Sequence, residues 1–479
     1  MEKTTGILVV LVIAVIMASA DGTVVLLAFP NMTQELATNV ASSIWTILAY
    51  MIVTAVFTTQ LGKFGDIYGR AKMFNSGFVL FTIASALCGA SPSIDFLIGF
   101  RVLQGVGAAM LLANSGAIVA DTFPREKLGR AYGYIAAGWG GGTLLGIILG
   151  GTLTTLFGWR YIFYINVPIG IIAVALGLKY VHDKNLMKRR IDLLGMALLG
   201  IALLLISYDA ISVAAVGFSW TDAALILLGV LIIIGLLFKE RHTKDPLIDL
   251  TIFKNRVLRY SLLAALFVAM GYFSVFFMIT LYLQGILGLT PLDAALLLAP
   301  GALIGLFLSP RMGRLSDRIG ARTVATGGVV AFAIAIIIYM AFLGASYFPF
   351  IVVIAAAIAG FGTAMFYPSN NAAVMANAEP GFYGSVNGLL RTLQNTGGLM
   401  SYVIVLYVAS ASVPRAVAFS VFVGTTQLLG GLSVSFTQGI QIAFAASLVL
   451  VVLAGILSLA RGKVTYNRAF RSRGHEVQK

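Results

Sequence analysis

Apolar stretches of about 18 to 27 residues, nearly free of charge, recur along the whole chain, and each is long enough to cross a hydrocarbon core about 30 Å thick. A soluble domain carries about a quarter charged residues. Here 59% of the 479 residues are hydrophobic and 10% are charged. The chain is therefore predicted to be an all-α integral membrane protein that crosses the bilayer many times.

The charged breaks between the apolar stretches delimit fourteen predicted membrane helices. Another apolar stretch, 416–434, is expected to form an interfacial or re-entrant hairpin in an outer loop, because a span there would place the basic C-terminal tail outside. The predicted helices are 7–29, 42–61, 73–91, 95–120, 131–153, 160–179, 193–211, 222–238, 258–284, 291–311, 322–343, 347–369, 382–410 and 438–460.

The distribution of basic residues predicts a multi-pass protein of the cell membrane with both termini in the cytoplasm. In that orientation all but four of the 32 Lys and Arg residues lie on the cytoplasmic side, as the positive-inside rule requires. The net charge of +14 therefore reflects topology, and no nucleic-acid partner is expected. Residues 18–20 resemble a signal-peptidase site, but cleavage there would misplace the basic loops, so the first helix is expected to remain.

Two segments predicted to be cytoplasmic loops share the spacing Gly-x3-Asp-x2-Gly, at 62–69 and at 313–320. The first and ninth predicted helices begin with the same offset, so the chain is expected to contain two related six-helix halves. Such halves surround a central site in secondary transporters. The predicted divisions are a bundle at 1–180, a two-helix insert with cytoplasmic linkers at 181–257, a second bundle at 258–460 and a basic cytoplasmic tail at 461–479.

An ordered set of motifs resembles the fourteen-helix drug:proton antiporter branch of the major facilitator superfamily. Two positions depart from the pattern of the branch. Leu26 stands where an Asn is usual. Ile147 replaces a proline in the fifth helix, which removes a kink site. This second departure leaves the predicted fold unchanged but weakens the prediction of antiport. The matching segments are 21–30, 62–72, 101–107, 158–168, 282–284 with Pro300, and 313–322.

The resemblance implies a major facilitator fold, two six-helix bundles plus two additional transmembrane helices. It also implies a secondary active transporter that works by alternating access, with proton-coupled efflux of lipophilic or cationic small molecules of the multidrug type. A proton-coupled symporter that imports a small metabolite is the alternative, and a channel is less favoured. The sequence has no nucleotide-binding loop, and no enzyme activity, cofactor or metal is expected. The protein is expected to function as a monomer. Its expected partners are the lipid bilayer, the small-molecule substrate and protons.

Asp21 lies well inside the first predicted helix, where an ionised carboxylate costs about 2.5–3.5 kcal/mol on insertion scales. Burial favours the protonated form of the carboxyl group. We therefore predict that Asp21 is a proton-coupling residue that alternately binds a proton and a cationic substrate. Arg101 falls at a similar depth in the fourth helix, where it would favour the ionised form. A purely structural pair of the two residues is the alternative.

The two repeated segments are predicted to form a cytoplasmic gate. The resemblance implies that charged pairs there hold the cytoplasmic side closed in the outward-facing state, and solvated basic loops are the alternative. The predicted gate residues are Gly62, Asp66, Gly69, Arg70 and Asp121 in the first half, and Asp317, Arg322 and Glu379 in the second half.

Polar and aromatic residues of three predicted helices are candidates for the substrate cavity. Several polar residues share one face of the thirteenth helix, and aromatic residues of the ninth helix can form an adaptable lipophilic wall, with packing against lipid as the alternative. Asn370 and Asn371 are expected only to end a helix. The predicted cavity residues are Gln104, Asn387, Arg391, Gln394, Tyr272 and Phe276.

Overall fold

Helices account for every regular element in the part of the chain that the structure describes. The computed structural model describes residues 3–462 except 39, 184–191, 216–218, 244–245, 247–249, 290, 345–347, 380–381 and 413–430. Within these residues the all-α prediction is confirmed. Twelve helices are long and apolar enough to cross a membrane. The predicted hairpin at 416–434 lies almost wholly outside the described residues.

The long helices match the fourteen predicted spans in order, within a few residues at most ends. α9 and α15 bring the twelve candidate spans to fourteen long helices. The helices are α1 (Lys3–Glu35), α3 (Trp45–Tyr68), α4 (Arg70–Gly89), α5 (Ile94–Thr122), α6 (Leu128–Phe157), α8 (Asn166–Tyr180, after the short α7, Tyr161–Tyr164), α9 (Leu193–Ala215), α10 (Trp220–Glu240), α11 (Arg256–Leu281), α12 (Pro291–Ile319), α13 (Ala321–Phe342), α14 (Phe348–Ala376), α15 (Tyr383–Ser412) and α17 (Gly431–Ala460).

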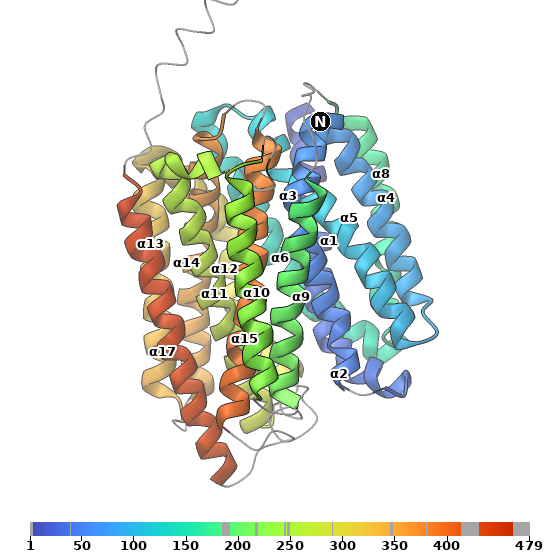
Figure 1. The fold of residues 1–479 in the computed structure, drawn as a ribbon, viewed down its shortest axis with the longest axis vertical. Coiled ribbons are helices and arrows are strands. Elements are labelled where there is room, and N and C mark those ends of the chain that lie inside the picture. The colour runs from blue at the N-terminus through green and yellow to red at the C-terminus, as the bar shows by residue number, and fades with distance from the viewer. Residues whose placement is uncertain are drawn as a thin grey trace, which may run out of the picture.

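The helices run side by side, with the early helices on one side of the molecule and the late helices on the other (Figure 1). α9 and α10 lie in front of the junction between them. α9 packs against both α3 and α15, and its Leu199 and Leu203 share an apolar cluster with Val56 and Leu399. α9 therefore contacts both halves of the bundle, and α10 packs against α9.

The repeated segments are helical over most of their length, which corrects the prediction of loops. α3 continues to Tyr68 and α12 continues to Ile319. The chain then reverses at a single residue, Gly69 in the first half and Gly320 in the second half. Their φ angles are +109° and +98°, in the region that favours glycine because it has no Cβ. The two turns have the same offset as the two motifs.

α6 belongs to the first half by sequence but packs against α1 on one side and α12 on the other. Its glycines make the contact with α1 close. A Cβ added at Gly142 would lie 2.7 Å from the carbonyl oxygen of Ile16, and one added at Gly146 would lie 2.7 Å from that of Ala20. Small residues at such positions let helix backbones approach closely in a membrane. α6 therefore links the interior of the first half to the second half.

An ion pair joins the ends of the two insert helices. The ammonium group of Lys239 in α10 binds both carboxylate oxygens of Asp192, which immediately precedes α9. Burial opposes the charged form of Asp192, but Lys239 and the N–H of Gly195 hold its pKa below the usual value. This pair fixes α9 against α10 at the end of the bundle where most basic residues gather, which we call the basic end.

Candidate functional site: a central cavity and two buried charge networks

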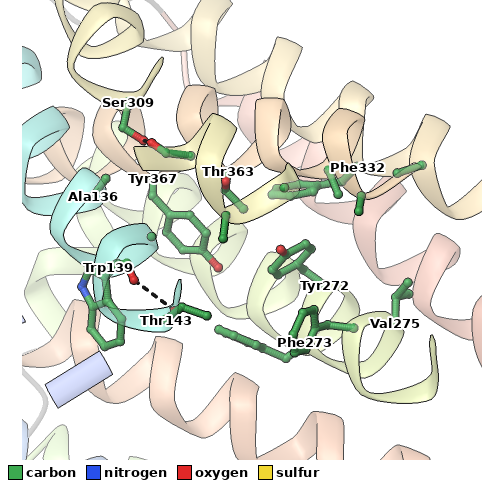
Figure 2. A pocket seen from close by; sticks show the side chains of 18 of the residues that line it. Ala136, Trp139, Thr143, Tyr272, Phe273, Val275, Ser309, Phe332, Thr363 and Tyr367 are labelled. Carbon is green, nitrogen blue, oxygen red and sulfur yellow. Dashed lines mark hydrogen bonds between the residues drawn. The ribbon is translucent and has the colours of Figure 1, made fainter. Parts of the chain in front are cut away.

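A cavity of about 260 Å³ lies between α6 and helices α11 to α15. Its wall is mainly apolar and aromatic, and Figure 2 shows Trp139, Tyr272 and Tyr367 around the same space. The rings of Tyr272 and Phe332 have centroids 4.8 Å apart. Phe276, also predicted from the aromatic run, lines this space as well. The aromatic residues of α11 therefore contribute to the cavity.

Two of the predicted polar residues reach the cavity. Arg391 and Gln394 are on α15, and the Arg391 Nη1 donates to Gln394 Oε1 at 3.1 Å. The amide nitrogen of Gln394 in turn lies 3.4 Å from Asn371 Oδ1. Asn371 also lines the cavity, which corrects the expectation that Asn370 and Asn371 only end a helix. α14 continues beyond them to Ala376.

The other two predicted polar residues lie outside the cavity lining. Asn387 donates from its amide nitrogen to the carbonyl oxygens of Leu112 and Ala113, at 3.0 and 2.7 Å. It therefore joins α15 to α5 across the two halves. Gln104 points into the first half instead, where it bonds to Asp21. Helical periodicity placed Asn387 on one face with Arg391, but these contacts place it in the helix interface.

Asp21 is the centre of a buried polar network inside the first half. Its carboxylate accepts from Arg101 Nη1 at 2.5 Å, from Gln104 Nε2 at 2.8 Å and from Asn166 Nδ2 at 3.4 Å. Arg101 also donates from Nε to the carbonyl oxygen of Thr46 at 2.9 Å. Asp21 and Arg101 are each 1% exposed. The network thus ties α1 to α3, α5 and α8.

The Asp21 carboxylate does not line the cavity described above. In this conformation its charge is balanced by Arg101, whose guanidinium also lies 4.2 Å from the centre of the Tyr50 ring. Direct contact between Asp21 and a cationic substrate in this cavity, as expected from the sequence, therefore does not fit the geometry. Any coupling between Asp21 and the cavity must act through the helices.

Asp66 caps a helix of the other half at the basic end. Its carboxylate accepts from the N–H groups of Gly384 and Ser385, both at 3.0 Å, and from the Ser385 hydroxyl at 2.9 Å. These groups belong to the first turn of α15, where the helix dipole favours a negative charge. Arg70 also donates to Asp66 at 2.7 Å and pairs with Asp121. The predicted acid–base cluster of the first half therefore assembles around an inter-half contact.

Asp317 makes the corresponding contact in the opposite direction. Its two carboxylate oxygens accept from the N–H groups of Gly129 and Arg130, at 2.8 and 2.9 Å. These residues belong to the first turn of α6. The predicted ion pair between Glu379 and the basic residues near Arg322 is not found among the described residues. Asp317 binds backbone donors of the other half.

Two pairs of glycines permit this contact. A Cβ added at Gly62 would lie 2.2 Å from the carbonyl oxygen of Gly384. One added at Gly313 would lie 2.1 Å from the carbonyl oxygen of Gly129. Any side chain at these positions would meet backbone atoms of the other half. We call the two glycine pairs, together with Asp66 and Asp317, the inter-half gate, after the role predicted for Gly62, Asp66 and Asp317, and in this structure its two sides are in contact.

Residues 11–402 match the family described as the Major Facilitator Superfamily. The chain belongs to this superfamily. It is 31% identical over 397 residues to "Riboflavin transporter RibZ" of Clostridioides difficile, covering 82% of this chain and 86% of that protein. It is 28% identical over 404 residues to "Multidrug resistance protein 3" of Bacillus subtilis, covering 82% and 77% respectively.

The fold is similar to that in the crystal structure of the human organic anion transporter MFSD10 (TETRAN), with a TM-score of 0.64. The two chains are 15% identical, and the match covers 95% of this chain and 99% of that chain. The predicted major facilitator fold is thus confirmed. The chain is a multi-pass membrane transporter and not an enzyme.

Sequence reasoning missed several residues of the site. Trp139 and Tyr367 line the cavity, but an isolated aromatic residue in an apolar helix carries no signal of which neighbour it faces. Ser385 was missed because it donates at the start of α15 to a carboxylate of the other half, and a backbone donor has no side-chain signature. The available signal is its position in the first turn of the predicted helix 382–410, where N–H groups have no partner within the helix.

We predict that Gly62→Val opens the inter-half gate. Its side chain would clash with the backbone of Gly384, and such overpacking costs about 1–3 kcal/mol, which changes the closed-to-open ratio about 5- to 150-fold. Spin labels at the exposed positions Glu126 and Ile319 should report a longer distance in the variant. Gly99→Val is the matched control, because a Cβ at Gly99 would meet no atom within 4 Å. An unchanged distance in Gly62→Val would contradict the gate.

Proposed function

We propose that this protein is a proton-coupled exporter of amphipathic small molecules that works by alternating access. The observation that carries the proposal is the arrangement of a central cavity, a closed inter-half gate and a buried carboxylate within one bundle. Relatives named multidrug resistance proteins support a transported molecule of this class. In the proposal the basic end faces the cytoplasm, so that the closed gate separates the cavity from the cytoplasm.

Proton coupling is assigned to Asp21 and Arg101. Protonation of Asp21 would remove the ionic bond between α1 and α5 and leave Arg101 held by Thr46 and Gln104. The cost of an uncompensated charge in a buried site would then favour a rearrangement of α1 relative to its neighbours. A proton that enters from outside would in this way weaken the conformation in which the gate is closed.

A short path of contacts connects Asp21 to the cavity. Ser19, two residues earlier on α1, donates from its hydroxyl to the carbonyl oxygen of Trp139 at 2.9 Å and lies 3.0 Å from the hydroxyl of Thr143. Trp139 and Thr143 line the cavity and are bonded to each other within α6 (Figure 2). Because α6 packs tightly on α1, a shift of α1 would be transmitted to this wall.

The available driving force is sufficient for concentrative export. One proton that enters down a membrane potential of about 150 mV, inside negative, contributes about 3.5 kcal/mol. At about 1.4 kcal/mol per factor of ten, this supports a concentration ratio of a few hundred-fold. A pH gradient of the same orientation would add to it.

We predict that Asp21→Asn abolishes pH-driven transport but preserves folding. The amide keeps the size of the side chain and cannot exchange a proton. The measurement is accumulation of a fluorescent substrate in proteoliposomes after a pH jump, with circular dichroism as the test of folding. Asp95→Asn is the matched control, because Asp95 is exposed in the first turn of α5. Undiminished pH-driven accumulation by Asp21→Asn would remove the assignment.

Proton-coupled uptake of one aromatic metabolite is the second candidate. It is favoured by the relative named a riboflavin transporter and by Ile147 in place of the proline of the antiporter motif.

Export and uptake predict opposite changes in the intracellular concentration of a substrate dye when the gene is deleted. If the protein exports, deletion of its gene should raise the intracellular concentration of a substrate dye at steady state, and an uncoupler should erase the difference between strains. Lower dye accumulation in the deletion strain would instead favour uptake.

A further inference from the structure

Arg391 is a buried cation in the cavity, and the described residues that line this cavity include no acid. The side chain is 5% exposed on α15. Among the described residues that line the cavity, it is the only one with a charge. An uncompensated charge away from water is costly, so its position in a mainly apolar cavity requires a physical reason.

Only part of the Arg391 guanidinium group is hydrogen-bonded within the described residues. Nη1 donates to Gln394, and the guanidinium carbon lies 5.9 Å from the centre of the Trp139 ring. Nε and Nη2 have no hydrogen-bond partner in the described part of the chain. Arg101, at 1% exposed, instead uses its Nε and Nη1 on a carbonyl and on the carboxylate of Asp21. The arginine that holds the first half together has an acid, whereas the arginine of the cavity has none.

The two free groups of Arg391 lie on one edge of the guanidinium plane. Nε–H and Nη2–H point in parallel from that edge and match the two oxygens of a carboxylate. The other unpartnered polar atoms of the lining include the indole N–H of Trp139, the hydroxyl of Tyr367 and the amide nitrogen of Asn395. Indole and amide nitrogens only donate. The buried lining atoms without a hydrogen-bond partner among the described residues are therefore donors, together with one hydroxyl that can both donate and accept.

We propose that the cavity binds an amphipathic organic anion, with its carboxylate on the Nε/Nη2 edge of Arg391 and its apolar body against Tyr272 and Phe332. The proposal rests on the proposed transport function and names its substrate class, in place of the cation expected from the sequence. A cation would approach an unpaired positive charge in a site of low dielectric constant, where like charges repel strongly. A cavity of about 260 Å³ suits a body of two fused rings.

The test is equilibrium binding of three naphthalene probes to the purified protein in nanodiscs, measured by quenching of tryptophan fluorescence. The probes are 1-naphthaleneacetate, its methyl ester and 1-naphthalenemethylammonium, which share the apolar body and differ in charge. Because hydrogen bonds to a charged group contribute about 1.5–3 kcal/mol, the acid should bind about 10- to 100-fold more tightly than the ester. The ammonium compound should bind more weakly than the ester.

Arg391→Met should make the acid and the ester bind equally, and Arg391→Lys should retain only part of the preference because an ammonium lacks the planar edge. Arg311→Met is the matched control, since Arg311 is exposed and bonded only to the carbonyl oxygen of Phe307 among the described contacts. Folding is monitored by thermal unfolding. Removal of a buried unpaired charge should leave the midpoint of Arg391→Met unchanged or raise it.

Three results would overturn the proposal: equal binding of all three probes by the wild type, preferential binding of the ammonium probe, or a preference for the acid that persists in Arg391→Met. Failure of the wild type to bind the acid counts against it in the same way. The assay contains no pH gradient, so a failure of proton-driven transport leaves these outcomes unaffected. Conversely, Asp21→Asn should keep the preference for the acid.

Discussion

An ionised side chain inside a membrane protein is stable only where other groups replace the water that it has lost, and this constraint organises the structure. Asp21 is stabilised by Arg101 and by two amides. Asp66 is stabilised by Arg70 and by the first N–H groups of α15. Each solution ties together elements that would otherwise be independent: helices within one half in the first case, and the two halves in the second. A change of protonation or of bonding at these points therefore has structural consequences beyond the residue itself.

The three buried networks have different roles because they lie at different interfaces. The Asp21 network lies within the first half and can respond to a proton without contact with the substrate. The inter-half gate uses backbone donors at helix starts, so it can open without leaving a side-chain cation uncompensated on the other half. Arg391 lies in the cavity between the halves and has no acidic partner among the described residues that line it. If that acid comes from the substrate, exchange of one proton for one monovalent anion moves two charges, and a potential of about 150 mV contributes about 7 kcal/mol to export.

Much of this organisation could be predicted from the chain, but the partners could not. A rise of 1.5 Å per residue placed Asp21 and Arg101 at similar depth, and the repeated spacing identified Asp66 and Asp317. The donors to those two carboxylates are backbone N–H groups of distant helices, which have no side-chain signature. Asn387 shared a helical face with Arg391, yet periodicity specifies a face and not its neighbour, and Asn387 bonds to α5. The helical extent of the repeated segments was missed because each glycine was taken as evidence of a turn, whereas among the glycines of these two segments only Gly69 and Gly320 have positive φ.

Measurement of proton release on substrate binding shows whether Asp21 carries the exchanged proton. The purified protein would be titrated with a transported substrate in weakly buffered solution that contains a pH-sensitive dye. We expect substrate binding to release protons from the wild-type protein and to release none from Asp21→Asn, which still binds the substrate. Equal proton release by the two proteins would contradict the account, because the exchanged proton would then belong to another group.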